Sequence, residues 1–125
     1  PQVVHRIISP KMKTVRDFRA RQAAEALSPD VADQLKDLMR SSERNTYGYN
    51  GNNYASKTGT AEHGEGLAPH TWYVAFDEEK DVAVAVVVKN GGGLGDGATG
   101  GRVAAPIGRT VLATAPGAGD QQGGN

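Results

Sequence analysis

The chain has 125 residues, with 14 basic and 14 acidic side chains and no cysteine. This length fits one domain with a single core, which should bury roughly two thirds of the unfolded surface. The balanced charge argues against nucleic acid as a partner, and the lack of cysteine excludes disulfides and thiolate metal sites. No apolar run approaches the ~20 residues of a membrane span, and no charged-then-apolar leader opens the chain. We therefore expect a soluble domain.

The N-terminal region predicts one strand and leaves the following segment open. Residues 2–8 alternate as a half-buried strand does, and they begin almost at Pro1 without an initiator Met. Because chain ends seldom lie directly against a core strand, we expect a piece of a longer polypeptide. Residues 14–18 are compatible with a second strand, and residues 20–27 have helix-forming composition without a clean apolar stripe.

A helix is predicted over residues 28–40. Ser28 can cap free amides, Pro29 fits the first helical position, and Asp30 complements the positive end of the dipole. The apolar stripe of this helix consists of Val31, Leu35, Leu38 and Met39. This spacing is typical of core packing.

Three further strands and a second helix complete the predicted fold. The strands are residues 54–62, 71–77 and 81–89, and the helix is 102–113. The connections are short enough to imply antiparallel neighbours. The strand 81–89 is apolar on both faces, which requires a cover on each side, and the two helices are the covers this chain offers. We therefore predict an α+β fold, an antiparallel β-sheet with flanking helices, over residues 1–115, and a disordered tail over 116–125.

The stretch from Tyr54 to His63 is an unusual strand. Its alternation places hydroxyls on one face and a lysine beside a glycine on the other, so neither face is suited to a core. If the strand lies at a sheet edge, Lys57 can organise a site while Thr58 reaches a bound carboxylate from the opposite face. Gly59 permits close approach of a substrate backbone, and the Thr60 amide can donate to an oxyanion. These four residues point to acyl transfer on a peptide.

The sequence also resembles a known family. Lys57-Thr58-Gly59 is similar to the third signature of penicillin-binding proteins and serine β-lactamases. The runs A-S-K-T-G-T-A-E-H, P-H-T-W-Y-V-A-F, V-A-V-A-V-V-V-K-N-G and T-G-G-R-V-A-A-P-I-G-R resemble the C-terminal portion of a class B penicillin-binding protein of actinobacterial type. The likeness covers roughly residues 28–113 and is weaker towards Pro1.

This resemblance implies a peptidoglycan D,D-transpeptidase that acts through an acyl-serine intermediate. Stem peptides would be its substrates and β-lactams its suicide substrates. Lys57 would engage the serine of the middle motif and help proton transfer, Thr58 would bind the substrate carboxylate, and the Thr60 amide would complete the oxyanion hole beside Gly59. The family further implies attachment to the outer face of the cytoplasmic membrane through an N-terminal segment absent here. It implies no cofactor and no metal.

The chain departs from the family in one respect. None of its serines is followed by x-x-Lys or by x-Asn; they are Ser9, Ser28, Ser41, Ser42 and Ser56. The nucleophile, its lysine and the middle motif are therefore expected upstream, on the same domain or on a companion chain. A non-catalytic, β-lactam-sensing module is the alternative, although Lys and Gly weaken a strand and are hard to explain on a scaffold.

Other patterns indicate binding sites less strongly. Residues 95–100 match G-x-G-x-x-G, but no return strand follows, and we interpret them as a strand-to-helix loop. Glu62, His63, Glu65 and His70 match no metal-site spacing. Tyr47, Tyr49 and Tyr54 are compatible with a groove lining or a surface lid. His5, Trp72 and Phe76 are interpreted as structural, with Tyr73 facing away from the two core aromatics.

Overall fold

The computed structural model describes residues 4, 6–18, 24 and 26–117. Two short strands, β1 (Arg6–Ile8) and β2 (Thr14–Asp17), form an antiparallel hairpin. The observed β1 is the C-terminal part of the predicted strand 2–8, whose residues 2, 3 and 5 lie outside the described ranges. Strand β2 forms within residues 14–18, whose sequence leaves a second strand open. His5, most of segment 20–27 and residues 118–125 of the predicted tail also lie outside them.

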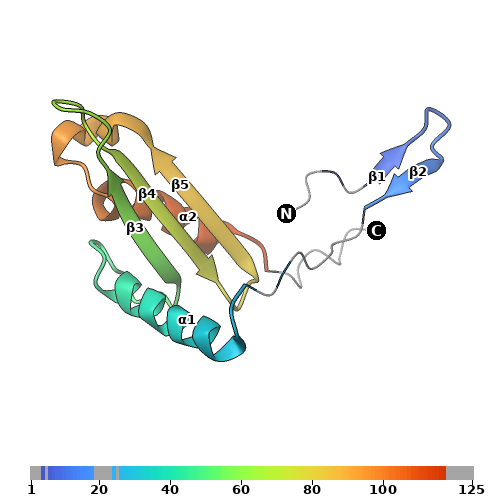
Figure 1. Cartoon of the computed structure of the whole chain (residues 1–125), viewed down its shortest axis with the longest axis horizontal. Coiled ribbons are helices and arrows are strands. Elements are labelled where there is room, and N and C mark those ends of the chain that lie inside the picture. Colours follow the sequence, from blue (N-terminus) through green and yellow to red (C-terminus); the bar gives the residue numbers. More distant parts are fainter. Residues whose placement is uncertain (1–3, 5, 19–23, 25, 118–125) are drawn as a thin grey trace.

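A three-stranded sheet forms the centre of the remaining chain (Figure 1). Its strands are β3 (Ala55–Ala61), β4 (His70–Asp77) and β5 (Val82–Val88), in that spatial order. Both neighbouring pairs are antiparallel, as the short connections predicted. In the turn between β4 and β5, Asp77 accepts a hydrogen bond from the backbone N–H of Glu79, and Asp81 adopts a left-handed conformation.

Helix α1 (Pro29–Arg44) lies beside β3. It begins where the Ser28-Pro29-Asp30 pattern predicted, but the Ser28 side chain makes no capping hydrogen bond. The helix continues one turn beyond the predicted end at residue 40. Residues 41–44 are polar, so their sequence suggested a loop. In the structure, however, the Glu43 side chain is buried against the sheet, and this burial extends the helix.

The second helix packs on one face of the sheet. Helix α2 (Ala105–Thr114) follows a single π-helical turn, η2 (Gly100–Ala104), and both contact β4 and β5. The preceding segment, which overlaps the predicted strand-to-helix loop at 95–100, contains the 3₁₀ turns of η1 (Lys89–Gly97). Neither α1 nor α2, within the described part of the chain, is long and apolar enough to cross a membrane.

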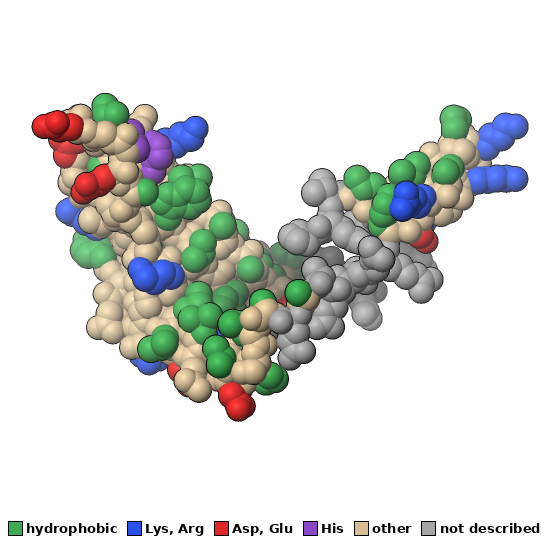
Figure 2. Space-filling model, viewed as in Figure 1, with side chains coloured by type: hydrophobic (Ala, Val, Ile, Leu, Met, Phe, Trp, Pro, Cys, Tyr) green, Lys and Arg blue, Asp and Glu red, His purple; other side chains and the backbone are tan. Residues whose placement is uncertain are grey.

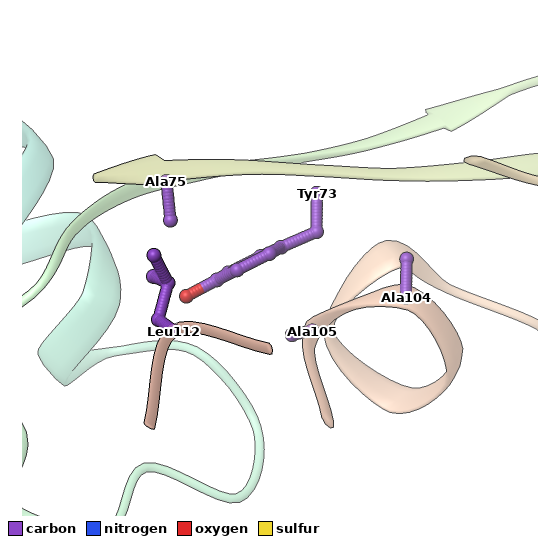
Figure 3. Close-up of a cluster of buried hydrophobic side chains, with 5 residues drawn as sticks. All are labelled: Tyr73, Ala75, Ala104, Ala105 and Leu112. Carbon is purple, nitrogen blue, oxygen red and sulfur yellow. The ribbon is translucent and has the colours of Figure 1, made fainter. Parts of the chain in front are cut away.

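The hydrophobic core lies between the sheet and α2. Figure 3 shows Tyr73 and Ala75 pointing from β4 towards Ala104, Ala105 and Leu112. Gly108 makes this packing possible, because a Cβ there would lie 2.6 Å from the Cε1 atom of the Tyr73 ring. Tyr73 is fully buried, so it is Tyr73 that serves as the aromatic anchor of the core.

The opposite face of the sheet, called the open face below, carries exposed apolar side chains. Trp72 is 42% exposed there, and strand register puts Val74 and Val87 on the same face. Leu35 and Leu38 of α1 are exposed and line a hollow with Lys57. Figure 2 shows hydrophobic side chains over the sheet and α1. The prediction that Trp72 is a core residue is therefore wrong for the described structure. Helix α1 contacts β3 and does not cover β5, so the two-sided cover expected for strand 81–89 is supplied on the α2 side alone among the described residues.

Candidate functional site

Strand β3 carries the predicted site residues along an edge of the sheet. One side of β3 pairs with β4 from Ala55 to Ala61, and no described strand pairs with its other side. Helix α1 lies along β3 without replacing a strand. A free strand edge presents backbone donors and acceptors that an extended peptide can pair with. The edge position, on which the interpretation of residues 57–60 depended, is present in the described part of the chain.

Lys57 and Thr58 lie on opposite faces of the sheet. Lys57 is opposite Val74 in the pairing, is exposed on the open face, and lines a hollow of about 330 Å³ with α1 residues Leu38 and Met39. Its Nζ donates to the carbonyl of neighbouring Thr58 over 2.6 Å. Thr58 is opposite Tyr73 and is half-buried on the α2 side. The cation is thus free of any ion pair within the described residues, and it faces the uncovered side of the sheet.

Gly59 and Thr60 continue the strand towards its C-terminal end. A Cβ on Gly59 would meet no atom closer than the Trp72 Cβ at 3.4 Å, and the glycine does not adopt a positive φ. Packing and backbone conformation within the described residues therefore do not require glycine at this position. Thr60 is exposed, and its hydroxyl accepts a weak bond of 3.4 Å from the N–H of Gly100.

Gly100 supports this part of the strand from the α2 side. A Cβ on Gly100 would collide with the carbonyl of Trp72 and would lie 2.7 Å from the carbonyl of Gly59. Both are backbone atoms, so neither can rotate away. The first turn of η2 consequently lies directly against the backbone of the β3–β4 pair.

Replacing Gly100 by Ala is expected to destabilise the protein by about 1–3 kcal/mol, the usual cost of forcing extra volume into a packed site. The measurement is the free energy of unfolding, with Gly97→Ala as control, because a Cβ on Gly97 has no atom within 4 Å. Equal stability of the two variants would contradict the close packing of η2 on β3.

A buried ionic cluster lies beneath the N-terminal half of β3. Glu43 is 0% exposed and Arg109 of α2 is 6% exposed, and their Oε1 and Nε atoms are 2.7 Å apart. The same Oε1 accepts from the amide of Asn52 at 2.9 Å. Glu43 Oε2 accepts from the hydroxyl of Ser56 at 2.5 Å and from that of Tyr73 at 3.0 Å. The carboxylate of Glu43 on α1 therefore contacts the loop before β3, the strands β3 and β4, and α2.

The electrostatics of the cluster favour a charged glutamate. Burial raises the pKa of Glu43, but hydrogen bonds from Arg109, Ser56 and Asn52 and the charge of Arg109 outweigh it and leave this pKa below its ordinary value. Burial and the adjacent Glu43 charge raise the pKa of Tyr73 to about 12, so its hydroxyl stays protonated and donates. The cluster is a fixed set of donors around one anion.

Sequence reasoning missed both Glu43 and Arg109. Glu43 lies in a polar run that resembles a loop, and Arg109 lies 66 positions away. The available signal was the position of Glu43 on the helical stripe, since it follows Leu35 and Met39 at intervals of four.

The weaker sequence patterns form separate features. The rings of His63 and His70 lie 3.9 Å apart, and burial and the charge of His63 lower the pKa of His70. The described residues contain no cluster of three or more metal-ligating side chains. Tyr47 and Tyr54 line a pocket of about 370 Å³ beside α2, and Lys57 is not part of its lining. In the G-x-G-x-x-G segment, Gly100 packs on the sheet backbone.

Residues 1–113 match the family model of the penicillin binding protein transpeptidase domain, and the chain belongs to this family. It is 44% identical over 123 residues to the peptidoglycan D,D-transpeptidase PbpA of Mycolicibacterium smegmatis, covering 92% of this chain and 25% of that protein. The PbpA of Mycobacterium tuberculosis is 41% identical with the same coverage. The crystal structure of PBPA from that organism matches with a TM-score of 0.76, covering 90% of this chain and 27% of that one. The chain thus spans about a quarter of these curated relatives.

Proposed function

We propose that this chain supplies the Lys-Thr-Gly wall of a peptidoglycan D,D-transpeptidase that forms an acyl-serine intermediate. The observation that carries the proposal is the free edge of β3, which presents Lys57 on one face and Thr58 on the other. Membership of the transpeptidase family and 41–44% identity to PbpA proteins support it.

Each site residue has a proposed role, which the resemblance to the transpeptidase family implies. Lys57 engages a serine brought by the upstream part of the domain and assists proton transfer. Thr58 binds the carboxylate of the stem peptide or of a β-lactam, and Gly59 lets the substrate backbone approach. The Thr60 amide donates to the developing oxyanion, a contribution whose loss typically costs ~10²–10³ in rate.

The upstream part of the same domain is proposed to supply the nucleophile and to cover the open face. No serine in this sequence begins an S-x-x-K or S-x-N motif, so this chain alone is proposed to be inactive. The exposed apolar side chains of the open face, among them Trp72 and Val74, give that part a surface on which to pack. By analogy with the family, we propose that the complete protein acts at the outer face of the cell membrane.

Fluorescent penicillin tests this proposal. The complete protein is expected to become covalently labelled, whereas the isolated chain is not. Covalent labelling of the isolated chain would disprove the upstream nucleophile, and absence of labelling in both would favour a non-catalytic β-lactam-sensing or scaffold module. Metal chelation and added nucleotides are expected to leave labelling unchanged, because the proposed chemistry uses neither.

Thr58→Val in the complete protein is expected to weaken penicillin binding about tenfold, because it removes one hydroxyl at nearly constant shape. The half-saturating penicillin concentration for acylation is measured, with Thr110→Val as a control on the exposed side of α2. Unchanged half-saturation in Thr58→Val would contradict the carboxylate-binding role.

A further inference from the structure

The ionic cluster holds the catalytic strand at the residue next to Lys57. Ser56 directly precedes Lys57 in β3 and is fully buried, and its hydroxyl donates to Glu43. Tyr73 is opposite Thr58 in the strand pairing and donates to the same carboxylate oxygen. One oxygen of Glu43 therefore contacts both strands at the level of the Lys57–Thr58 pair.

The second oxygen of Glu43 fixes that carboxylate to the rest of the molecule. It accepts from Arg109 of α2 and from Asn52 in the loop before β3. Arg109 is itself held by a 2.9 Å hydrogen bond from Nη1 to the carbonyl of Tyr47. The anion is consequently attached to three segments outside the sheet and cannot shift without breaking several bonds.

This arrangement compensates for a weakness of the strand. The outer edge of β3 has no strand partner among the described residues, and Lys57 and Gly59 are residues that weaken a strand. No side chain of β3 belongs to the buried core cluster, whose members lie on β4, η2 and α2. Polar anchoring from below replaces the support that a second neighbouring strand would give.

We propose that Glu43 is a positioning residue for the transpeptidase reaction: through Ser56 and Tyr73 it sets the position of Lys57, Thr58 and the Thr60 amide relative to the nucleophile. The proposal rests on the function proposed above. A displacement of about 1 Å in such a constellation can cost on the order of 10²-fold in rate. Glu43 is fully buried and both of its carboxylate oxygens accept from protein donors, so it acts without touching substrate.

The test is penicillin acylation of the complete protein carrying Ser56→Ala, which removes the bond nearest Lys57 and retains the Glu43–Arg109 pair. The first-order acylation constant at saturating penicillin is expected to fall about tenfold. The half-saturating concentration should change less than the acylation constant, because the Thr58 hydroxyl proposed to bind the ligand is retained. Thr71→Val is the matched control, because the Thr71 hydroxyl is also buried in this sheet but has no hydrogen-bond partner in the described structure.

A double-variant comparison separates positioning from general stability. Glu43→Gln is expected to lower the acylation constant at least as much as Ser56→Ala, and adding Ser56→Ala to it should have little further effect. Glu78→Gln breaks the exposed ion pairs of α1 with Lys36 and Arg40 and should leave acylation unchanged. If the unchanged protein is labelled and the Ser56→Ala variant is acylated at the same rate, the positioning role is disproved while the proposed function stands. If the unchanged protein is not labelled, the proposed function fails and this inference fails with it.

Discussion

Lys57→Met in the complete protein is expected to reduce the first-order rate of penicillin acylation by about 10²–10⁴-fold, the range for losing a residue that assists proton transfer. The methionine retains the length and apolar stem of lysine and removes the charge. Lys57 makes no ion pair in the described structure, and its hydrogen bond goes to the adjacent Thr58 carbonyl. The fold should therefore survive the change.

The measurement is single-turnover labelling by fluorescent penicillin, accompanied by the melting temperature of each variant. Lys36→Met is the matched control, because Lys36 is a lysine of α1 that pairs with Asp33 and Glu78 on the surface. Surface pairs contribute about 0–1 kcal/mol, so the control should alter neither stability nor acylation substantially. Acylation of Lys57→Met at the rate of the control would refute the catalytic role of Lys57.

The sequence predicts the placement of Lys57 and Thr58 on β3 because the relevant pattern is local. Alternation within β3 determines that Lys57 and Thr58 face opposite sides, and the pairing with Val74 and Tyr73 agrees. The start of α1 is also encoded locally, since Pro29 and Asp30 suit the first helical turn. Local sequence was sufficient to predict both the facing of Lys57 and Thr58 and the start of α1.

The features missed by sequence reasoning depend on contacts between distant segments. Alternation separates Trp72 from Tyr73 but cannot state which of the two faces α2, and the structure buries Tyr73. Burial of Glu43 depends on Arg109, which belongs to a helix formed 66 residues later. A glutamate without that partner would favour solvent, so the sequence around residue 43 resembled a loop.

Removal of Arg109 is expected to have the largest effect on stability. Arg109→Met leaves the carboxylate of Glu43 buried without a cation, and breaking a buried pair in this way costs about 3–5 kcal/mol. Adding Glu43→Gln removes the uncompensated buried charge. The double variant should therefore be more stable than Arg109→Met alone, although both members of the ion pair have been replaced.

Chemical denaturation of the complete protein, with hydrogen exchange of the 43–60 segment, measures this coupling. Arg40→Met provides the control, because Arg40 pairs with Glu78, whose side chain is 51% exposed. A surface pair of this kind should cost at most about 1 kcal/mol. Additive losses from the Glu43→Gln and Arg109→Met changes would show that the two side chains do not stabilise the fold as a pair.

The same cluster predicts the direction of the pH dependence. The pKa of Glu43 lies below its ordinary value of 4.5 in the folded protein, so folding stabilises the ionised form. The resulting stabilisation is complete above the unfolded-state pKa and is lost as the pH falls through the lower folded-state value. The melting temperature of the unchanged protein should consequently fall more steeply below about pH 4.5 than that of the Glu43→Gln/Arg109→Met variant. Parallel acid profiles would indicate that Glu43 does not change protonation between the folded and unfolded states, and would contradict the ionised cluster beneath β3.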